Sequence, residues 1–348
     1  MKRIKPLFFI LAVLFAIIIV VPTLLVLPFT TEKNSLVANQ NNTQISANNT
    51  VEASAASILQ EPTLEVAVYR SNTKKIDKIM LEDYVKGVVA SEMPAEFELE
   101  ALKAQALTAR TYIVKQMVTN EQISTPEGAD VTDTVIHQVY KSPAELKQIW
   151  GAADYEWKMA RISEAVEATK GQIITYKNEP ITASFFSTSN GYTENSEDYW
   201  KNSFPYLRSV ESPWDTASPK FQNQAVISVP DFEKKLGVKV SDQLVGKVIA
   251  RTKGNRVAKV DINGKIFEGR EVRELLGLKS SDFTWKKQGN QIIITTKGYG
   301  HGVGMSQYGA NGMATEGKSF EDIITHYYQG TTISNVDPYL KDTIVARK

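Results

Sequence analysis

One side chain in this sequence is well placed to do acid–base chemistry: Glu92, a carboxylate two positions before Pro94. Met93 precedes the proline and is disfavoured in the helical region, so a helix arriving from Leu81 is expected to end at about Glu92. The carboxyl end of a helix carries partial negative charge, which disfavours a second negative charge there. The apolar side chain of Val88, one turn earlier, disfavours charge as well. Both effects raise the pKa of a carboxyl.

A carboxyl that stays protonated near neutral pH can act as a general acid toward a leaving oxygen. The same position also fits an ordinary solvated glutamate at a frayed helix end. Local sequence favours that second interpretation, because structural and exposed acids outnumber catalytic ones. Glu92 is therefore a candidate acid whose role local sequence does not decide.

Two further segments carry side chains that could bind a polar substrate. Arg110 lies on a helix expected from about Glu98 to Val118, where it could reach a hydroxyl, an acetamido oxygen or a carboxylate, or be a surface arginine. Residues 187–200, STSNGYTENSEDYW, combine hydrogen-bonding groups with aromatic rings, as sugar sites do, but a polar hairpin connection would look alike. The candidates there are Ser187, Ser189, Asn190 and Tyr192.

Glycine alternates with other residues in the segment KGYGHGVGMSQYGA, residues 297–310. It is not a dinucleotide-binding loop, because the GxGxxG spacing and a surrounding βαβ unit are missing. Glycine tolerates positive φ and close backbone approach, so this segment is expected to be a tight turn. Such a turn would bring His301, Gln307 and Tyr308 to the wall of a site.

Composition excludes several other classes of site. The 348 residues carry a net charge of +1 and no basic stripe, which argues against nucleic acid as a partner. There is no cysteine, so disulfides, thiolate zinc sites and a cysteine nucleophile are excluded. The three histidines, His137, His301 and His326, lack metal-ligand spacing and are expected to be structural.

The first thirty residues predict a membrane anchor. From Leu7 to Phe29 the only polar residue is Thr23, and about 20 apolar residues can cross a bilayer as a helix. The basic residues Lys2, Arg3 and Lys5 precede this run, so a cytoplasmic N-terminus is expected. A cleaved signal peptide is the alternative, although the apolar run is longer than a usual signal core.

The remainder of the chain predicts an α+β fold with an inserted subdomain. Residues 31–60 are rich in Asn, Ser, Thr and Ala and are expected to form a flexible tether after the transmembrane anchor, residues 1–30. Strand and helix patterns without βαβ alternation predict a mixed catalytic core over residues 61–225 and 295–345. Residues 226–294 are expected to form a smaller α+β subdomain inserted into that core.

Four segments between residues 84 and 314 together resemble a known family. They are, in order, YVKGVVASEMPAEFELEALKAQALTARTYIV, STSNGYTENSEDYW, FPYLRSVESPWD and GYGHGVGMSQYGANGMA. In these motifs the chain is similar to the stage II sporulation protein D family, which are membrane-anchored peptidoglycan lytic transglycosylases of endospore-forming bacteria. The resemblance covers the anchor, the tether and nearly all of the folded region.

The resemblance implies roles for individual residues. The catalytic glutamate of the family falls on Glu92, its helix arginine on Arg110, and its glycine–histidine loop on residues 300–307. The expected substrate-binding residues are Arg110, Ser187, Ser189, Asn190, Tyr192, Arg208, His301, Gln307 and Tyr308. Some members hold zinc with a cysteine near the segment HQVY. This chain keeps His137 but has no cysteine, so neither a metal nor another cofactor is expected, and His137 should be structural or contact substrate.

The chemistry implied by the resemblance needs only one acid. Most glycosidases use two carboxylates. A lytic transglycosylase cleaves the bond between N-acetylmuramic acid and N-acetylglucosamine without water, because the muramic 6-hydroxyl closes a 1,6-anhydro ring. Glu92 would protonate the leaving oxygen and then accept the proton of that hydroxyl. Glu96, Glu194 and Asp198 are the nearest candidates for a second carboxylate, and none should be essential.

Partners and a place of action are also implied. Glycan strands, a cell-wall amidase and another sporulation membrane protein are the expected partners, and no nucleic acid is expected. The resemblance places the catalytic domain outside the cytoplasm, on the mother-cell side of the sporulation septum, where it would remodel the wall during engulfment. The alternative is a non-catalytic cell-wall binding scaffold that stimulates a partner amidase.

Overall fold

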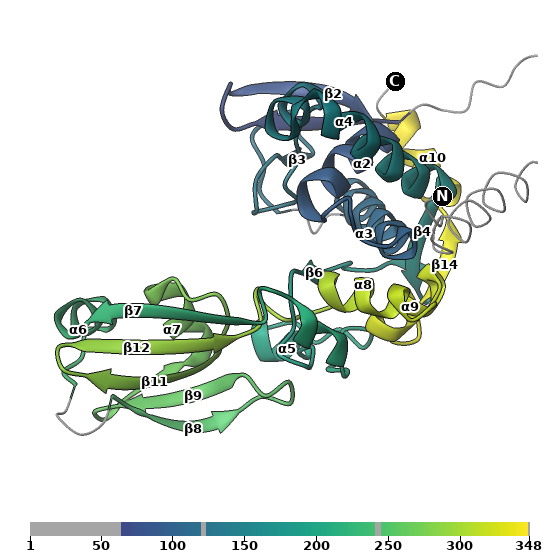
Figure 1. Ribbon diagram of the computed structural model, residues 1–348. Helices are drawn as coiled ribbons and strands as arrows, with labels where there is room; N and C mark the ends of the chain where they lie inside the picture. Colours follow the sequence, from purple (N-terminus) through teal and green to yellow (C-terminus); the bar gives the residue numbers. More distant parts are fainter. Residues whose placement is uncertain (1–63, 120–122, 241–244, 347–348) are drawn as a thin grey trace, which may run out of the picture. The chain divides into compact units, whose positions relative to one another are not determined.

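The computed structural model (Figure 1) describes residues 64–119, 123–240 and 245–346. Its first strands, β1 (Glu65–Arg70) and β2 (Lys75–Met80), form an antiparallel hairpin, and β3 (Val131–Thr132) pairs in parallel with β1. The alternation of apolar residues that predicts a strand here buries Val66 and Val68 completely.

Three helices follow and form the frame on which Glu92 sits: α2 (Leu81–Glu92), α3 (Leu99–Val118) and α4 (Pro143–Ala168). Helix α3 is central, since it contacts α2 and α4 on one side and the later helices α8 and α9 on the other (Figure 1). Fourteen of its twenty residues are buried, as expected for a helix surrounded by protein. A capping box of Ser142 and Glu145 starts α4, and Gly151, at φ 77°, kinks it.

The chain continues with short strands and helices, several of which contact α3. These elements are β4 (Gln172–Tyr176), β5 (Glu179–Pro180), β6 (Phe185–Phe186), α5 (Ser196–Tyr199), the 3₁₀ helix η1 (Pro213–Ala217), β13 (Met305–Ser306), α8 (Gln307–Thr315), α9 (Phe320–Tyr327), β14 (Thr332–Asn335) and α10 (Asp337–Ala346). Strand β6 pairs in parallel with β13. That pairing brings the start of the polar loop, residues 187–200, to the end of the glycine-rich segment.

Between η1 and β13 the chain forms a second hydrophobic cluster, separate from the one around α3. Its elements are β7 (Gln222–Ser228), α6 (Val229–Leu236), β8 (Lys247–Arg251), β9 (Val257–Ile262), β10 (Lys265–Glu268), α7 (Gly269–Leu276), β11 (Asp282–Gln288) and β12 (Gln291–Lys297). The strands form two antiparallel sheets, in the orders β10-β9-β8 and β11-β12-β7. All buried residues of this cluster fall between Phe232 and Ile294. The division of the chain into domains, including an insertion at residues 226–294, stays a prediction.

The predicted fold class and location require one correction. The structure is a mixture of helices and strands, but no helix within residues 64–119, 123–240 and 245–346 combines the length and apolar character needed to cross a bilayer. The segment Leu7–Phe29, to which the span was assigned, lies outside the described residues. The membrane-spanning helix in the predicted fold class and the single-pass membrane location are therefore not upheld.

Candidate functional site

Glu92 is the last residue of α2, as the proline rule predicts. Met93 adopts an extended conformation (φ −125°, ψ 137°), and its N–H still bonds to the carbonyl of Val89. The carboxyl of Glu92 is half-buried, and its Oε1 accepts a hydrogen bond from the backbone N–H of Val139 at 2.8 Å. Burial raises the pKa of Glu92, and the N–H of Val139 offsets part of that rise. None of the ion pairs among the described residues includes Glu92.

The backbone N–H that contacts Glu92 belongs to a segment fixed against α2. Gln138 accepts a hydrogen bond from the hydroxyl of Tyr84 at 3.3 Å, and the Tyr84 ring stacks on Tyr140 with 5.5 Å between ring centres. A Cβ on Gly87 would collide with the Tyr140 ring, so this close approach requires glycine. The contact of Val139 with Glu92 is thus held by side chains on both of its flanks.

His137 lies in the same segment and acts as an acceptor. Its Nδ1 accepts from the backbone N–H of Thr132 at 3.3 Å and lies 2.9 Å from the Thr132 hydroxyl. The ring is therefore neutral with its proton on Nε2, and burial lowers its pKa. No cluster of three or more His, Asp or Glu that could hold a metal occurs within the described residues.

Arg110, expected at the substrate, is instead buried completely. Its Nε and Nη2 form an ion pair with Glu82 of α2, at distances down to 2.6 Å. Its remaining N–H groups bond to the hydroxyl of Thr169 and to the carbonyls of Val166 and Gln172. A guanidinium with every donor satisfied inside the protein ties helices together, and the predicted contact of Arg110 with substrate stays a prediction.

Side chains of the polar loop, residues 187–200, also make contacts inside the protein. Ser189 is fully buried and donates through its backbone N–H and its hydroxyl to Asp215, at 2.8 Å each. Asp215 accepts two further hydroxyl bonds, from Ser212 and Ser306, while burial raises its pKa. Ser189 is therefore held inside the protein, and its predicted contact with substrate stays a prediction. Asp215 was missed because its partners lie far apart in sequence.

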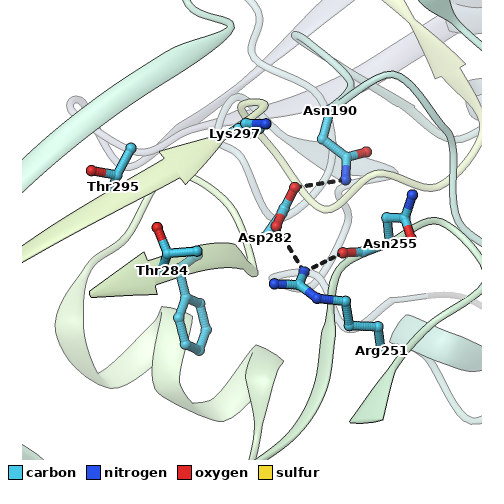
Figure 2. A pocket seen from close by; sticks show the side chains of 8 residues that line it. Asn190, Arg251, Asn255, Asp282, Thr284, Thr295 and Lys297 are labelled. Carbon is cyan, nitrogen blue, oxygen red and sulfur yellow. Dashed lines mark hydrogen bonds and ion pairs between the residues drawn. The ribbon is translucent and has the colours of Figure 1, made fainter. Parts of the chain in front are cut away.

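The other loop candidates face the inserted strands. The amide nitrogen of Asn190 donates to the carbonyl of Gly254 at 2.9 Å and to Asp282 at 3.0 Å, and Figure 2 shows Asp282 held between Asn190 and Arg251. The backbone carbonyl of Tyr192 accepts from Arg256 at 3.1 Å. These contacts fix the loop to the turn between β8 and β9 and to the start of β11, and no hydrogen bond that the structure gives for either residue leads to Glu92.

Arg208 and Ser187 lie at less buried positions of the same loop region. Arg208 holds Glu197 with two nitrogens, each 2.6 Å from a carboxylate oxygen, and the guanidinium lowers the pKa of Glu197 to about 2. Both side chains of this pair are about one-third exposed. Ser187 is half-buried and accepts the backbone N–H of Tyr308 through its carbonyl. Substrate contact by either residue stays a prediction.

The glycine-rich segment is a tight turn, and its glycines Gly298, Gly300, Gly302 and Gly304 all have positive φ. At Gly304 a Cβ would fall on the carbonyl of Ser184, so only glycine fits. His301 sits among the rings of Phe186, Tyr199 and Trp200, with ring centres 5.4–5.6 Å away. Burial lowers the pKa of His301 to about 3, so this imidazole is neutral and cannot serve as an acid near neutral pH.

Helix α8 lies against the segment that follows Glu92. The ring of Tyr308 meets Phe97 edge-on at 4.9 Å, and the backbone N–H of Glu98 donates to Asn311 at 2.8 Å. Gln307 is buried and donates to Gln105 of α3 at 3.3 Å. Among the predicted substrate-binding residues, Tyr308 is thus brought to the segment next to Glu92, while His301 belongs to a separate aromatic cluster.

Each candidate second carboxylate bonds to a residue other than Glu92. Glu194 is 2% exposed and pairs with Arg256 at 3.0 Å. Glu96 is exposed and pairs with Lys158 at 3.1 Å, and Asp198 accepts from Asn195 at 2.9 Å. The arrangement around Glu92 therefore offers one carboxyl with a raised pKa and one N–H donor, which suits proton transfer to and from a single bound molecule.

This chain is similar to known proteins over nearly its whole length. Residues 69–176 match the family model described as "Stage II sporulation protein". Stage II sporulation protein D of Bacillus amyloliquefaciens is 52% identical over 337 residues, which cover 97% of this chain and 98% of the relative. The chain belongs to the stage II sporulation protein D family. The family member of Bacillus subtilis (strain 168) is also 52% identical, over 95% of this chain and 96% of its own.

A relative of lower identity is not named as a stage II sporulation protein D. The Amidase enhancer of Bacillus subtilis (strain 168) is 31% identical over 306 residues, which cover 72% of this chain and 40% of the relative. The family predicted from the four motifs is confirmed, and the chain is a sporulation protein.

The raised pKa of Glu92 predicts a pH-dependent effect of replacing it. The folded protein keeps the proton to higher pH than the unfolded chain, so Glu92 favours folding below its unfolded pKa, and this contribution is lost as pH rises through the folded pKa. Chemical denaturation should therefore show Glu92→Gln gaining stability relative to wild type between about pH 4 and about pH 7.

The exposed Glu96→Gln is the control for that experiment and should show no such trend. Equal stability differences for Glu92→Gln at both pH values would mean that the pKa of Glu92 is not raised.

Proposed function

We propose that this protein is a lytic transglycosylase that cleaves peptidoglycan between N-acetylmuramic acid and N-acetylglucosamine during sporulation. The observation that carries the proposal is the environment of Glu92. Its pKa is raised, Oε1 is held by the N–H of Val139, and Oε2 has no hydrogen bond among the described residues. The raised pKa favours the protonated carboxyl, and Oε2 is the oxygen left available to a substrate oxygen.

The reaction uses that one carboxyl twice. Glu92 donates its proton to the glycosidic oxygen, the bond from that oxygen to C1 of the muramic sugar breaks, and the N-acetylglucosamine end leaves as an alcohol. The muramic 6-hydroxyl oxygen bonds to C1, and its proton passes to the Glu92 carboxylate. The acid is restored and no water is consumed. No second carboxylate is needed, in keeping with the separate contacts of Glu96, Glu194 and Asp198.

The alternative function is that of a cell-wall binding scaffold that stimulates a partner amidase. One observation favours it, namely the similarity to a relative named Amidase enhancer. Under either proposal the expected partners are glycan strands, a cell-wall amidase and a second sporulation protein.

Incubation with purified glycan strands, without any second protein, separates the two functions. The transglycosylase produces new chain ends by itself. If no ends form but an added cell-wall amidase runs faster in its presence, the scaffold function is right.

Independence from metal is a further expectation, based on zero cysteines and on histidines without ligand spacing. Cleavage should continue at an unchanged rate after dialysis against EDTA. Loss of cleavage on chelation, restored by added zinc, would contradict it.

A further inference from the structure

A cavity lies where the polar loop meets the inserted strands. Its volume is about 440 Å³, within the roughly 300–1,000 Å³ that ligand sites span. One wall is formed by α5 and the residues beside it, and the other by β9, β10 and the start of α7. Neither Glu92 nor any of the substrate-binding residues predicted from the sequence lines it.

Two arginines of α7 hold the aromatic wall of this cavity in place. Tyr199 accepts hydrogen bonds from Arg270 at its carbonyl, at 2.7 Å, and from Arg273 at its hydroxyl, at 2.8 Å. The Arg270 guanidinium also lies over the Tyr199 ring, 4.9 Å from its centre. The Tyr199 ring meets Trp200 edge-on. The two rings are therefore fixed before any ligand arrives.

The floor of the cavity contains a buried ion pair. Arg256 and Glu194 are each 2% exposed at the side chain and lie 3.0 Å apart, and Thr252 donates to Glu194 at 2.8 Å. Desolvating two charges costs free energy, which contacts of this kind must offset. The pair ties the loop to the turn that connects β8 and β9.

The lining chemistry selects a neutral ligand with both polar edges and apolar faces. The lining holds four acidic residues, Glu194, Glu197, Asp198 and Glu268, and four basic residues, Lys201, Arg256, Lys259 and Arg270. These charges balance, so neither a polyanion nor a polycation is favoured. Carboxylates and ammonium groups can bond hydroxyl and amide edges, while Tyr199 and Trp200 can cover the apolar face of a ring.

We propose that this cavity binds an N-acetylated amino sugar of the glycan strand, as an accessory subsite outside the catalytic site at Glu92. The choice of sugar rests on the proposed function. Glu268 lies directly across from Lys259 in the β9–β10 pair, and both line the cavity, so an acceptor and a donor stand side by side for the sugar edge.

The full-length protein can be titrated with the N-acetylglucosamine tetramer, with tryptophan fluorescence as the readout. The part of the signal that Trp200→Phe removes, and that the exposed Trp157→Phe retains, reports the cavity. Ala258→Phe fills the cavity and should weaken tetramer binding at least tenfold. The matched control is Ala153→Phe, at an exposed position of α4.

A second pair of variants covers the case in which Ala258→Phe does not fold. Glu268→Gln should weaken binding several-fold, while Glu271→Gln, which removes a charge from the same end of α7 but does not line the cavity, should not. The proposal is overturned if the tetramer does not bind, or if Glu268→Gln binds the tetramer as wild type does. Failure of the proposed function would instead appear as absence of new glycan ends, whatever the tetramer does.

Discussion

Replacing Glu92 by glutamine is expected to lower glycan cleavage by about a hundredfold to ten-thousandfold, the usual contribution of general acid–base catalysis. Glutamine keeps the size of the side chain, and its amide oxygen can still accept the N–H of Val139. Its amide cannot transfer a proton to the leaving oxygen at the pH of the assay. The loss should therefore fall on the rate of the bound complex, with little change in affinity for strands.

Two control measurements accompany this prediction. Glu96→Gln, at an exposed position four residues after Glu92, should cleave at the wild-type rate. The thermal midpoint of Glu92→Gln should be no lower than that of wild type near neutral pH. Cleavage by Glu92→Gln at the wild-type rate would remove Glu92 from the mechanism.

Replacing Arg110 by methionine is expected to lower the free energy of unfolding by about 3–5 kcal/mol, because it leaves the Glu82 carboxylate without its partner. Lys86→Met is the control. Lys86 is on the same helix as Glu82 and forms ion pairs with Asp83 and Glu167 that are more exposed, which are worth about 0–1 kcal/mol.

The double variant Glu82→Met with Arg110→Met distinguishes a structural role from substrate contact. A buried ion pair replaced as a whole by apolar groups often costs little stability, so the double variant should regain most of the lost stability and cleave glycan. If the double variant is as stable as wild type but binds strands more weakly, Arg110 contacts substrate as well.

The end of α2 shows what could be predicted from the sequence. The bounds of this helix and the position of Glu92 follow from local rules, namely the spacing of apolar residues and the effect of Pro94 on Met93. The strand alternation before it was equally readable, because it depends on neighbours in the chain. The raised pKa of Glu92 comes instead from burial in the fold, which local sequence did not decide.

Partners distant in sequence account for what could not be predicted. Arg110 and Ser189 looked available to a substrate because Glu82 and Asp215, which engage them, are 28 and 26 positions away. No pattern in one sequence reveals which polar groups a fold brings together. Nothing in the sequence indicated that Asp215 and its serine partners would form a hydrogen-bond network.

The segment VIHQVY, residues 135–140, illustrates the limit of strand patterns. It reads as a strand but forms none, since β3 ends at Thr132, and Val135 and Ile136 are exposed. The N–H of Thr132 bonds to His137 instead. This irregular backbone leaves the N–H of Val139 free to meet Glu92, so the departure from the strand pattern marks part of the candidate site.

The chemical identity of the new chain ends tests the central claim most directly. Purified strands digested by the protein alone would be analysed by mass spectrometry. If the substrate's own 6-hydroxyl is the nucleophile, the new muramic ends are 1,6-anhydro sugars, lighter by one water than hydrolytic ends. Reducing ends of full mass, lost on replacing Glu194 or Asp198 by its amide, would contradict the single-acid mechanism and indicate a two-carboxylate hydrolase.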